Sequence, residues 1–118
     1  MKTIVVGAGT VGENIAKFLM REGHDVTVLD VQRPKLAAIE EELDVQTLTG
    51  NATDPNVLKE VYTDETDLLI AVTHRDEINL MVAFTAKKIG CARVIARVRS
   101  RFYYDNSMIN YKHPLGID

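Results

Sequence analysis

The sequence lacks most of the features that mark secreted, nucleic-acid-binding or membrane-spanning chains. It has one cysteine, Cys91, so it cannot form an internal disulfide and offers no cysteine cluster for a metal. Its 14 Lys and Arg residues face 17 Asp and Glu residues, and a net charge of −3 gives no general attraction to nucleic acid or an anionic membrane. The apolar runs are too short for a membrane helix, and no signal-peptide pattern, repeat or low-complexity segment is visible. We therefore expect a soluble cytoplasmic protein that holds no metal and does not insert into a membrane.

The chain is organised around a glycine-rich turn near its start. A β-branched run, Thr3 to Val6, leads into Gly-Ala-Gly-Thr-Val-Gly at residues 7–12, and a helical pattern follows. In such a turn the first glycine allows the sharp bend, the second lets a pyrophosphate approach the backbone, and the third lets the helix pack on the strand. A second apolar strand ends in Asp30, where a carboxylate would accept hydrogen bonds from ribose hydroxyls and repel a 2′-phosphate. The pattern predicts a site for NAD⁺ or NADH; the simpler reading is a structural turn and a surface acid.

Strand and helix patterns alternate through the rest of the chain. The predicted strands are residues 3–6, 26–29, 45–49, 67–73 and 93–98, and residues 115–118 are the lead-in to a truncated sixth. The second and fourth of these strands are nearly all apolar, as parallel strands covered on both faces are. Pro34 and Pro55 fit the first turns of intervening helices, with Asp54 as an N-cap. We predict a single Rossmann-like α/β domain over residues 1–118, a doubly wound parallel sheet with helices on both faces.

Three predictions concern the helices. One apolar stripe has the spacing of a buried helix face and consists of Val11, Ile15, Phe18 and Leu19. Residues 73–76 fit a capping box, with Asp76 in place of the usual Glu or Gln. Apolar residues cover more than one face of the helix at 78–89, which we interpret as a subunit interface or, alternatively, as burial under the domain's own C-terminal region.

Polar residues at other strand ends extend the candidate site, because ligands of open α/β sheets bind at the carboxyl ends of the strands. Asn51 follows the third strand and could meet an adenine edge or form a plain loop turn. Arg97 lies near the same rim, where it could approach a phosphate or remain solvated. Arg33 is close to Asp30 in sequence and could weaken a preference for NAD(H) over NADP(H).

Several segments together resemble the N-terminal nucleotide-binding domain of TrkA, also called the RCK or KTN domain. They are KTIVVGAGTVGENIAKFL with Asp30, the loop GNATDP, the run DLLIAVTHRDEINLMVAFTAKK and the strand RVIARVRS. The resemblance implies a cytoplasmic regulatory subunit of a Trk-type potassium uptake system that binds NAD⁺ or NADH, or in some relatives ATP or ADP. The implied partners are a membrane potassium transporter of Trk or Ktr type and further copies of the chain, at the inner face of the cell membrane.

The resemblance also implies which residues bind the cofactor. Thr73 matches a position that lines the pyrophosphate, and residues 73–79 match a T-x-x-D-E-x-N pattern. Asn51 stands where the family often has Asp, so the side chain still forms hydrogen bonds but has no charge. The expected cofactor-binding residues are Gly7, Ala8, Gly9, Thr10, Val11, Gly12, Asp30, Val31, Arg33, Asn51, Ala52, Thr73 and Arg97. Because family members continue through a sixth strand and a further lobe, we expect this chain to be a domain excised from a longer subunit.

The competing interpretation is the coenzyme-binding domain of an NAD-dependent oxidoreductase. Such an enzyme needs an acid or base beside a substrate pocket. No tyrosine is followed by a lysine four residues later, and His24, His74 and His113 are isolated in the sequence. We therefore favour a regulator without a catalytic residue, in which the nucleotide stabilises one arrangement of subunits over another.

Overall fold

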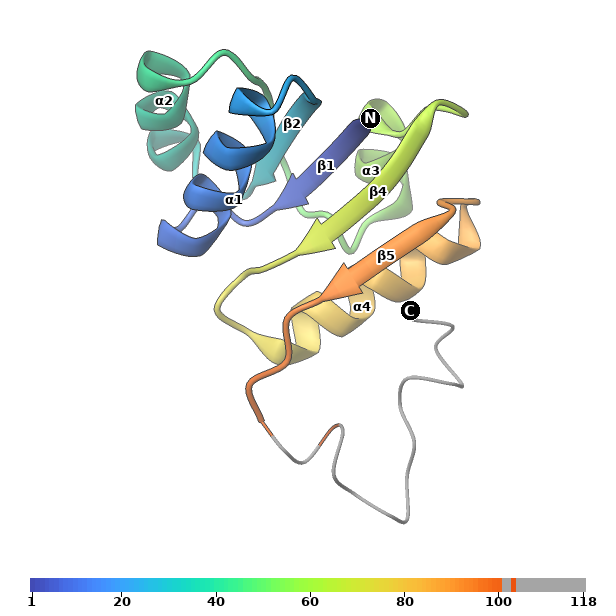
Figure 1. Cartoon of the computed structure of the whole chain (residues 1–118). Helices are drawn as coiled ribbons and strands as arrows, with labels where there is room; N and C mark the ends of the chain where they lie inside the picture. The colour runs from blue at the N-terminus through green and yellow to red at the C-terminus, as the bar shows by residue number, and fades with distance from the viewer. Residues whose placement is uncertain (101–102, 104–118) are drawn as a thin grey trace.

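The computed structural model describes residues 1–100 and Tyr103 (Figure 1). Strands and helices alternate without exception in this part of the chain. In order, the elements are β1 (Lys2–Val6), α1 (Thr10–Arg21), β2 (Asp25–Asp30), α2 (Arg33–Glu42), β3 (Gln46–Thr49), α3 (Pro55–Val61), β4 (Thr66–Ala71), α4 (Asp76–Lys88) and β5 (Arg93–Ala96). The predicted sixth strand and His113 lie outside the described residues.

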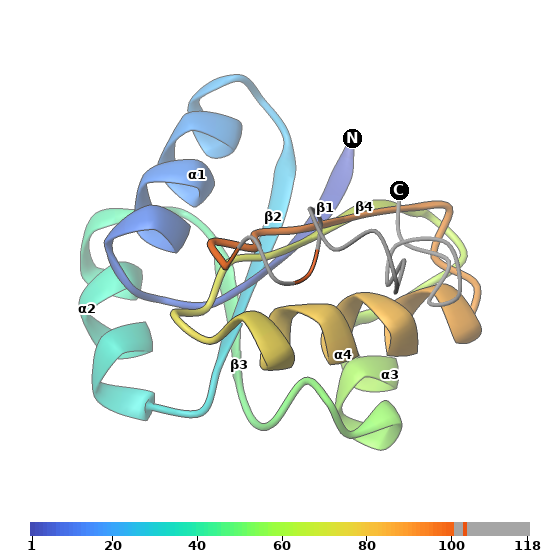
Figure 2. The same cartoon turned by 90° about the horizontal axis from the view of Figure 1, so that it is seen from below.

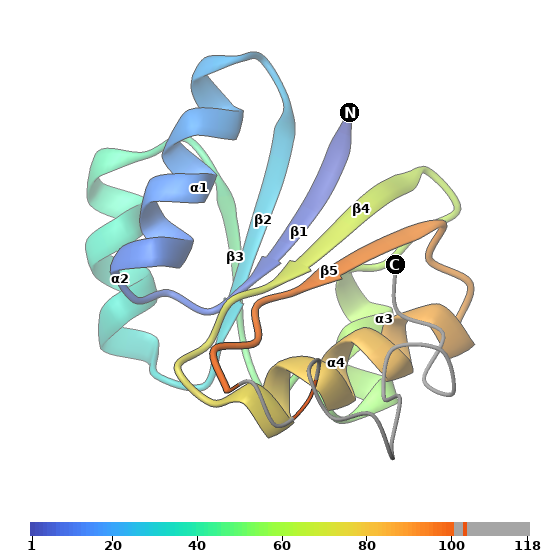
Figure 3. The same cartoon turned by 60° about the horizontal axis from the view of Figure 1, so that its bottom comes forward.

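The five strands form one parallel sheet in the order β3-β2-β1-β4-β5, which Figure 3 shows from left to right. The register pairs Val5 of β1 with Val28 of β2 on one side and with Ile70 of β4 on the other. Strand order reverses between β1 and β4, which is the topological switch point of a Rossmann sheet. The predicted fold class is confirmed for these strands.

Two apolar cores lie on opposite faces of the sheet. Figure 2 shows the helices that cover them, α1 and α2 on one side and α3 and α4 on the other. On one face, α1 and α2 pack over residues such as Val5 and Val28. On the other face, α3 and α4 pack over alternate residues such as Ile4 and Leu69. Successive strand side chains point to opposite faces, so a strand between two helix layers is buried on both faces, and the central strands are apolar apart from threonines such as Thr3 and Thr27.

The apolar stripe predicted for α1 is confirmed for Leu19, which is buried, and for Ile15, which packs against the core, but it is wrong for Val11 and Phe18. The buried face consists of Gly12, Ala16 and Leu19, whereas Phe18 is 63% exposed and Val11 is 39% exposed. A glycine and an alanine face the sheet because α1 lies close to it: a Cβ on Gly12 would stand 1.7 Å from the Gly7 carbonyl oxygen. Val11 and Phe18 therefore lie beside the contact and not in it.

The predicted interface helix is largely covered by its own domain. Leu80, Val82, Ala83 and Ala86 of α4 are buried, and α4 contacts β4, β5 and α3. The sheet and α3 therefore cover most of the apolar surface of α4, although Met81 remains 47% exposed. The predicted alternative, burial under the domain's own C-terminal region, involves residues outside the described part of the chain. Self-association of the chain stays a prediction.

Candidate functional site

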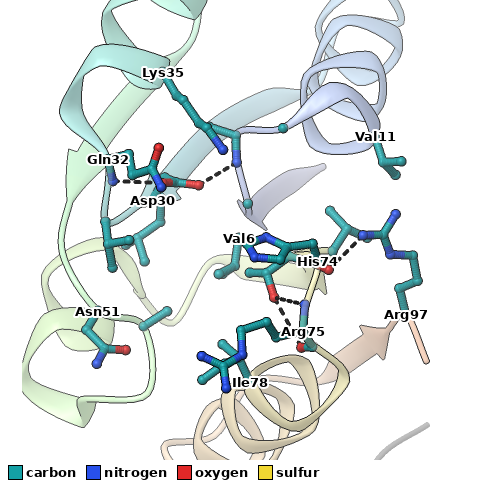
Figure 4. A pocket seen from close by; sticks show the side chains of 18 of the residues that line it. Val6, Val11, Asp30, Gln32, Lys35, Asn51, His74, Arg75, Ile78 and Arg97 are labelled. Atoms are coloured by element: carbon teal, nitrogen blue, oxygen red, sulfur yellow. Dashed lines mark hydrogen bonds between the residues drawn. The ribbon is translucent and has the colours of Figure 1, made fainter. Parts of the chain in front are cut away.

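A cavity of about 500 Å³ opens where the carboxyl ends of the strands meet, at the switch point between β1 and β4 (Figure 4). Four loops form its wall: those after β1, β2, β3 and β4, together with the residue that follows β5. The lining residues are Val6, Gly7, Ala8, Gly9, Thr10, Val11, Leu29, Asp30, Val31, Gln32, Lys35, Gly50, Asn51, Ala52, Val72, Thr73, His74, Arg75, Ile78 and Arg97. The volume and the largely apolar walls suit a nucleotide-sized ligand.

The three glycines of the first loop differ in whether, and why, the domain itself requires a glycine at that position. Gly7 has a φ of +117°, a conformation that residues with a side chain rarely adopt, and a Cβ there would lie 3.0 Å from the backbone of Thr73. Gly12 is fixed by its contact with the Gly7 carbonyl. Gly9 has an ordinary φ of −78°, and a Cβ there would meet no atom within 4 Å. Neither backbone strain nor packing within the domain therefore calls for glycine at position 9.

Gly9 is also the N-cap of α1, so the first turn of this helix faces the cavity. The first N–H groups of an α-helix have no intrahelical acceptor, and the helix dipole adds a partial positive charge at this end. Thr10 and Val11 of the same turn line the cavity. The arrangement provides backbone donors for an anion beside a position that is open to close approach.

Asp30 joins the end of β2 to the glycine loop. Its Oδ2 accepts a hydrogen bond from the Ala8 backbone N–H (2.8 Å), and its Oδ1 accepts one from the Gln32 backbone N–H (2.7 Å). Each carboxylate oxygen has two lone pairs, so both can still accept a hydrogen bond from a ligand hydroxyl. The carboxylate therefore holds the loop in place while it faces the cavity, a structural role that the sequence pattern did not suggest.

Asn51 forms the loop turn that was one of its two predicted roles. Its Oδ1 accepts hydrogen bonds from the backbone N–H of Thr53 (3.0 Å) and from the Thr53 hydroxyl (2.7 Å). An Asn side chain that bonds the backbone two residues on is a common turn motif. Asn51 also lines the cavity, where its Nδ2 amide is the group suited to meet a ligand.

The wall of the cavity formed by Thr73 and Arg97 is held in place by a buried side chain behind it, Asn79. Asn79 of α4 is fully buried, and it forms hydrogen bonds with the backbone of both Thr73 and Arg97. The Arg97 Nη2 donates to the Thr73 carbonyl oxygen over 2.7 Å. The Thr73 hydroxyl donates towards Asn79 Oδ1 (2.7 Å) and does not cap α4, whose N-cap is Arg75. The predicted capping box is therefore wrong.

Asp76, predicted as the last member of that capping box, binds the chain that leaves β5. Its two carboxylate oxygens accept hydrogen bonds from the backbone N–H groups of Arg99 (3.0 Å) and Ser100 (2.8 Å). The Arg99 N–H is the main cause that lowers the pKa of Asp76, helped by the Ser100 N–H and by the charges of Arg99 and Arg97, while desolvation opposes the shift. The first turn of α4 thus anchors the exit from the sheet.

Cations predominate at the mouth of the cavity. Among the described lining residues, Asp30 is the only carboxylate, against Lys35, Arg75 and Arg97. Figure 4 shows Lys35 extending from α2 towards Asp30 and the glycine loop. Arg75 is paired with Glu77 over 2.7 Å. This balance favours an anionic ligand, with the carboxylate confined to one end.

Arg33 does not line the cavity, contrary to its expected place in the site. Its guanidinium pairs with Glu40, about two turns further along the same side of α2 (2.8 Å), and this hydrogen bond raises the pKa of Arg33 and lowers that of Glu40. Lys35, two residues further along α2, is the cation that faces the cavity. The sequence offered a signal for this difference, because Arg33 and Glu40 are seven residues apart and share one side of the helix.

Most of the expected binding residues come together around the cavity. Gly12 lies just behind it and supports Gly7, as its predicted packing role requires. The residues that sequence reasoning missed are mainly Gln32, Lys35, His74, Arg75 and Ile78. They lie on the first turns of α2 and α4 or just before them, so the rule that helix N-termini meet the carboxyl edge of the sheet could have identified them.

No helix in the described part of the chain has the length and apolar character needed to cross a membrane. Comparison with known proteins gives a consistent picture. The family model for the TrkA-N domain matches residues 3–116. The Trk system potassium uptake protein TrkA homolog of Archaeoglobus fulgidus is 36% identical over 118 residues, which cover 100% of this chain and 26% of that protein. The Trk system potassium uptake protein TrkA of Halomonas elongata is 38% identical over 104 residues, covering 87% of this chain and 23% of that protein. The chain thus spans about a quarter of the length of these relatives.

Solved structures share the fold at lower sequence identity. The NAD(P)-binding domain of an exopolyphosphatase-related protein from Archaeoglobus fulgidus superposes with a TM-score of 0.85 at 19% identity, over 98% of this chain and 83% of that one. The TrkA-N domain of the inner membrane protein ybaL from Escherichia coli gives a TM-score of 0.80 at 19% identity, over 99% and 83%. These likenesses show the fold, and the sequence match shows the family. The chain belongs to the TrkA-N domain family.

Proposed function

We propose that the cavity binds NAD⁺ or NADH, and that the domain uses this ligand to regulate a potassium uptake system. The names of the curated relatives support the potassium system. The NAD(P)-binding domain among the structural neighbours supports a nucleotide, and ATP or ADP is the competing ligand. The regulated partner is a membrane transporter of Trk or Ktr type, so the domain works in the cytoplasm beside the membrane.

The observation that carries the ligand proposal is the open position at Gly9. A glycine that neither strain nor packing requires, at the start of a helix that faces a cavity, is explained by the close approach of a ligand to the backbone. Glycine is an acceptable N-cap in its own right, but Ser, Thr, Asn or Asp would cap α1 better. A pyrophosphate above Gly9 would meet the free N–H groups of α1.

The remaining residues fit the other parts of a dinucleotide. Asp30 would accept hydrogen bonds from the ribose hydroxyls. The adenine would be enclosed by the side chains of Val31 and Asn51 and by the backbone of Ala52. Arg97 lies across the cavity from Asp30 and Asn51 (Figure 4), and its guanidinium bonds the Thr73 carbonyl oxygen, so these two residues would face the pyrophosphate and nicotinamide. Asp30 would repel a 2′-phosphate, so we expect NAD(H) to bind more tightly than NADP(H), although Lys35 would reduce the difference.

A regulatory role explains the site better than catalysis does. An oxidoreductase would place an acid or base within hydrogen-bond reach of its substrate. His74 is the one histidine among the described lining residues, and it is exposed in the β4–α4 loop. A regulator needs only that the nucleotide bind one arrangement of subunits more tightly than another. We expect such arrangements to involve several copies of the chain, within longer subunits of which this domain is one part.

A calorimetric titration of the 118-residue chain with NAD⁺, NADH, ATP and ADP tests the proposal. We expect micromolar or tighter binding of at least one dinucleotide, and a loss of at least about 100-fold in Gly9→Val, because the branched side chain fills the space of the pyrophosphate. Ala38→Val adds similar bulk at an exposed position of α2 and should leave the affinity unchanged. Equal affinities in the wild type and Gly9→Val would refute the proposed site, and tight binding of ATP alone would replace the dinucleotide.

A further inference from the structure

We propose that Asn79 is a positioning residue for the phosphate end of the cavity. Through the backbone of Thr73 and Arg97, it holds the Arg97 guanidinium where a ligand phosphate binds. The inference rests on the proposed function, since it assumes a nucleotide with phosphates at this site. It concerns a side chain that does not line the cavity and would touch no ligand.

The carboxamide of Asn79 uses its full hydrogen-bonding capacity. Its Oδ1 accepts from the Thr73 N–H (2.8 Å) and the Thr73 hydroxyl (2.7 Å), and its Nδ2 donates to the carbonyl oxygens of Thr73 (3.0 Å) and Arg97 (2.9 Å). An amide has two acceptor and two donor positions, so none is left over. The pattern also fixes which way the amide points, because the reverse orientation would face N–H groups towards an N–H.

These bonds lie just beyond the last backbone hydrogen bond between β4 and β5. The last paired residues of β4 and β5 are Ala71 and Ala96, followed by one bond from the Arg97 N–H to the Ala71 carbonyl oxygen (2.9 Å). Thr73 lies beyond this point, and the Asn79 side chain bonds its N–H and its C=O in place of a neighbouring strand. Thr73 and Arg97 therefore keep a fixed separation at the rim of the cavity.

The consequence for Arg97 is a guanidinium that is anchored but not saturated. The Thr73 carbonyl oxygen accepts from both Asn79 Nδ2 and Arg97 Nη2, so Asn79 orients the group to which the guanidinium is tied. The Arg97 Nε–H is buried and has no hydrogen-bond partner in the described part of the chain. This buried nitrogen does not face the cavity, but Arg97 lines the cavity and is only partly buried, so a phosphate oxygen there can accept from guanidinium N–H groups that the Thr73 carbonyl oxygen does not use.

The test compares a ligand that has phosphates with one that lacks them. The 118-residue chain is titrated with NAD⁺ and with adenosine, each followed by backbone amide NMR shifts. We expect Asn79→Ser to weaken NAD⁺ binding by about tenfold, the size of one misplaced charge-assisted hydrogen bond, and to change adenosine binding by less than about twofold. Asn56→Ser, an exposed change on α3, is the matched control and should alter neither.

A double-mutant cycle with Arg97→Met separates positioning from general support of the fold. If Asn79 acts through Arg97, then Asn79→Ser changes NAD⁺ affinity by less than about twofold once Arg97 is replaced. Equal losses for NAD⁺ and adenosine, or additive effects in the cycle, would overturn the inference and leave the proposed function standing. Failure of the wild type to bind NAD⁺ would overturn both.

Because Asn79→Ser removes buried hydrogen bonds, its folding is checked by thermal unfolding. Arg97→Met keeps the inference falsifiable if Asn79→Ser does not fold. Arg97→Met must itself lower NAD⁺ affinity by at least about tenfold and spare adenosine. If it lowers neither affinity, or both to the same degree, the Arg97 guanidinium is not a phosphate group's partner and the inference fails.

Discussion

The two sides of the cavity are held in shape by different kinds of contact. At the first crossover, from β1 through α1 to β2, backbone packs directly on backbone, with Gly12 against the carbonyl of Gly7. At the rim where β4 and β5 end, a buried side chain, Asn79, bonds the backbone of both strand ends. The first kind of contact restricts residue type to glycine and is visible in a sequence. The second uses an ordinary residue type, whose role depends on what the fold brings near it.

The strongest test of this contrast is Gly12→Ala. A methyl group there would stand 1.7 Å from the Gly7 carbonyl oxygen and 2.8 Å from its carbon, so α1 must move away from β1. We expect a loss of about 3 kcal/mol in the free energy of unfolding, measured by urea denaturation, because backbone atoms cannot give way as a side chain can. Gly9→Ala is the control, with a loss of at most about 1 kcal/mol, because alanine is a poorer N-cap than glycine but meets no atom there. Similar stabilities of the two variants would contradict the close packing of Gly12 against the Gly7 carbonyl group.

A smaller loss of stability is expected at Asp30, the side chain that holds the glycine loop of the first crossover. Asp30→Ala removes the acceptor of the Ala8 and Gln32 N–H groups, and the Ala8 N–H lies in a buried residue. We expect a loss of about 1–2 kcal/mol in unfolding free energy, together with weaker NAD⁺ binding. Asp25→Ala, at the exposed start of the same strand, should cost less than about 0.5 kcal/mol. If Asp30→Ala lowers affinity without any loss of stability, the carboxylate serves the ligand alone.

The same contrast explains how far the sequence could predict the molecule. The five strands, the glycine turn and Asp30 follow from local patterns whose physical causes act within a few residues. The capping-box prediction was wrong because Thr73 bonds Asn79, and Asp76 bonds residues after β5. No spacing rule in the sequence indicates that Asp76 has a partner 23 residues away, at Arg99. The expected place of Arg33 in the site was missed for a local reason, because Arg33 forms an ion pair with Glu40 on the same helix.

The pH dependence of stability tests the contact that anchors the exit from β5. The pKa of Asp76 is lowered in the folded state, first by the Arg99 N–H. Its stabilising contribution is therefore fully present above the unfolded value near pH 4, and it is lost as the pH falls through the lower folded pKa. In urea denaturation at pH 7 to 2.5, we expect the stability difference between wild type and Asp76→Asn to shrink below about pH 4.

Arg99→Ala serves as the control for this pH effect. It removes the guanidinium charge but keeps the Arg99 backbone N–H, so most of the acid dependence should remain. Stability curves of wild type and Asp76→Asn that stay parallel down to pH 2.5 would show that the Asp76 contact contributes nothing to the rim.

The smallest effect is expected at Phe18 of α1, which the sequence pattern wrongly placed on the buried face. Phe18→Ser removes a large apolar side chain that is 63% exposed, and we expect a change below about 0.5 kcal/mol in unfolding free energy. Leu19→Ala, one residue on and 9% exposed, should cost about 2–3 kcal/mol. Both are measured at two protein concentrations a hundredfold apart. A cost above 1 kcal/mol for Phe18→Ser that grows with concentration would mean that another copy of the chain covers this side of α1, because only a contact between molecules depends on how many are present.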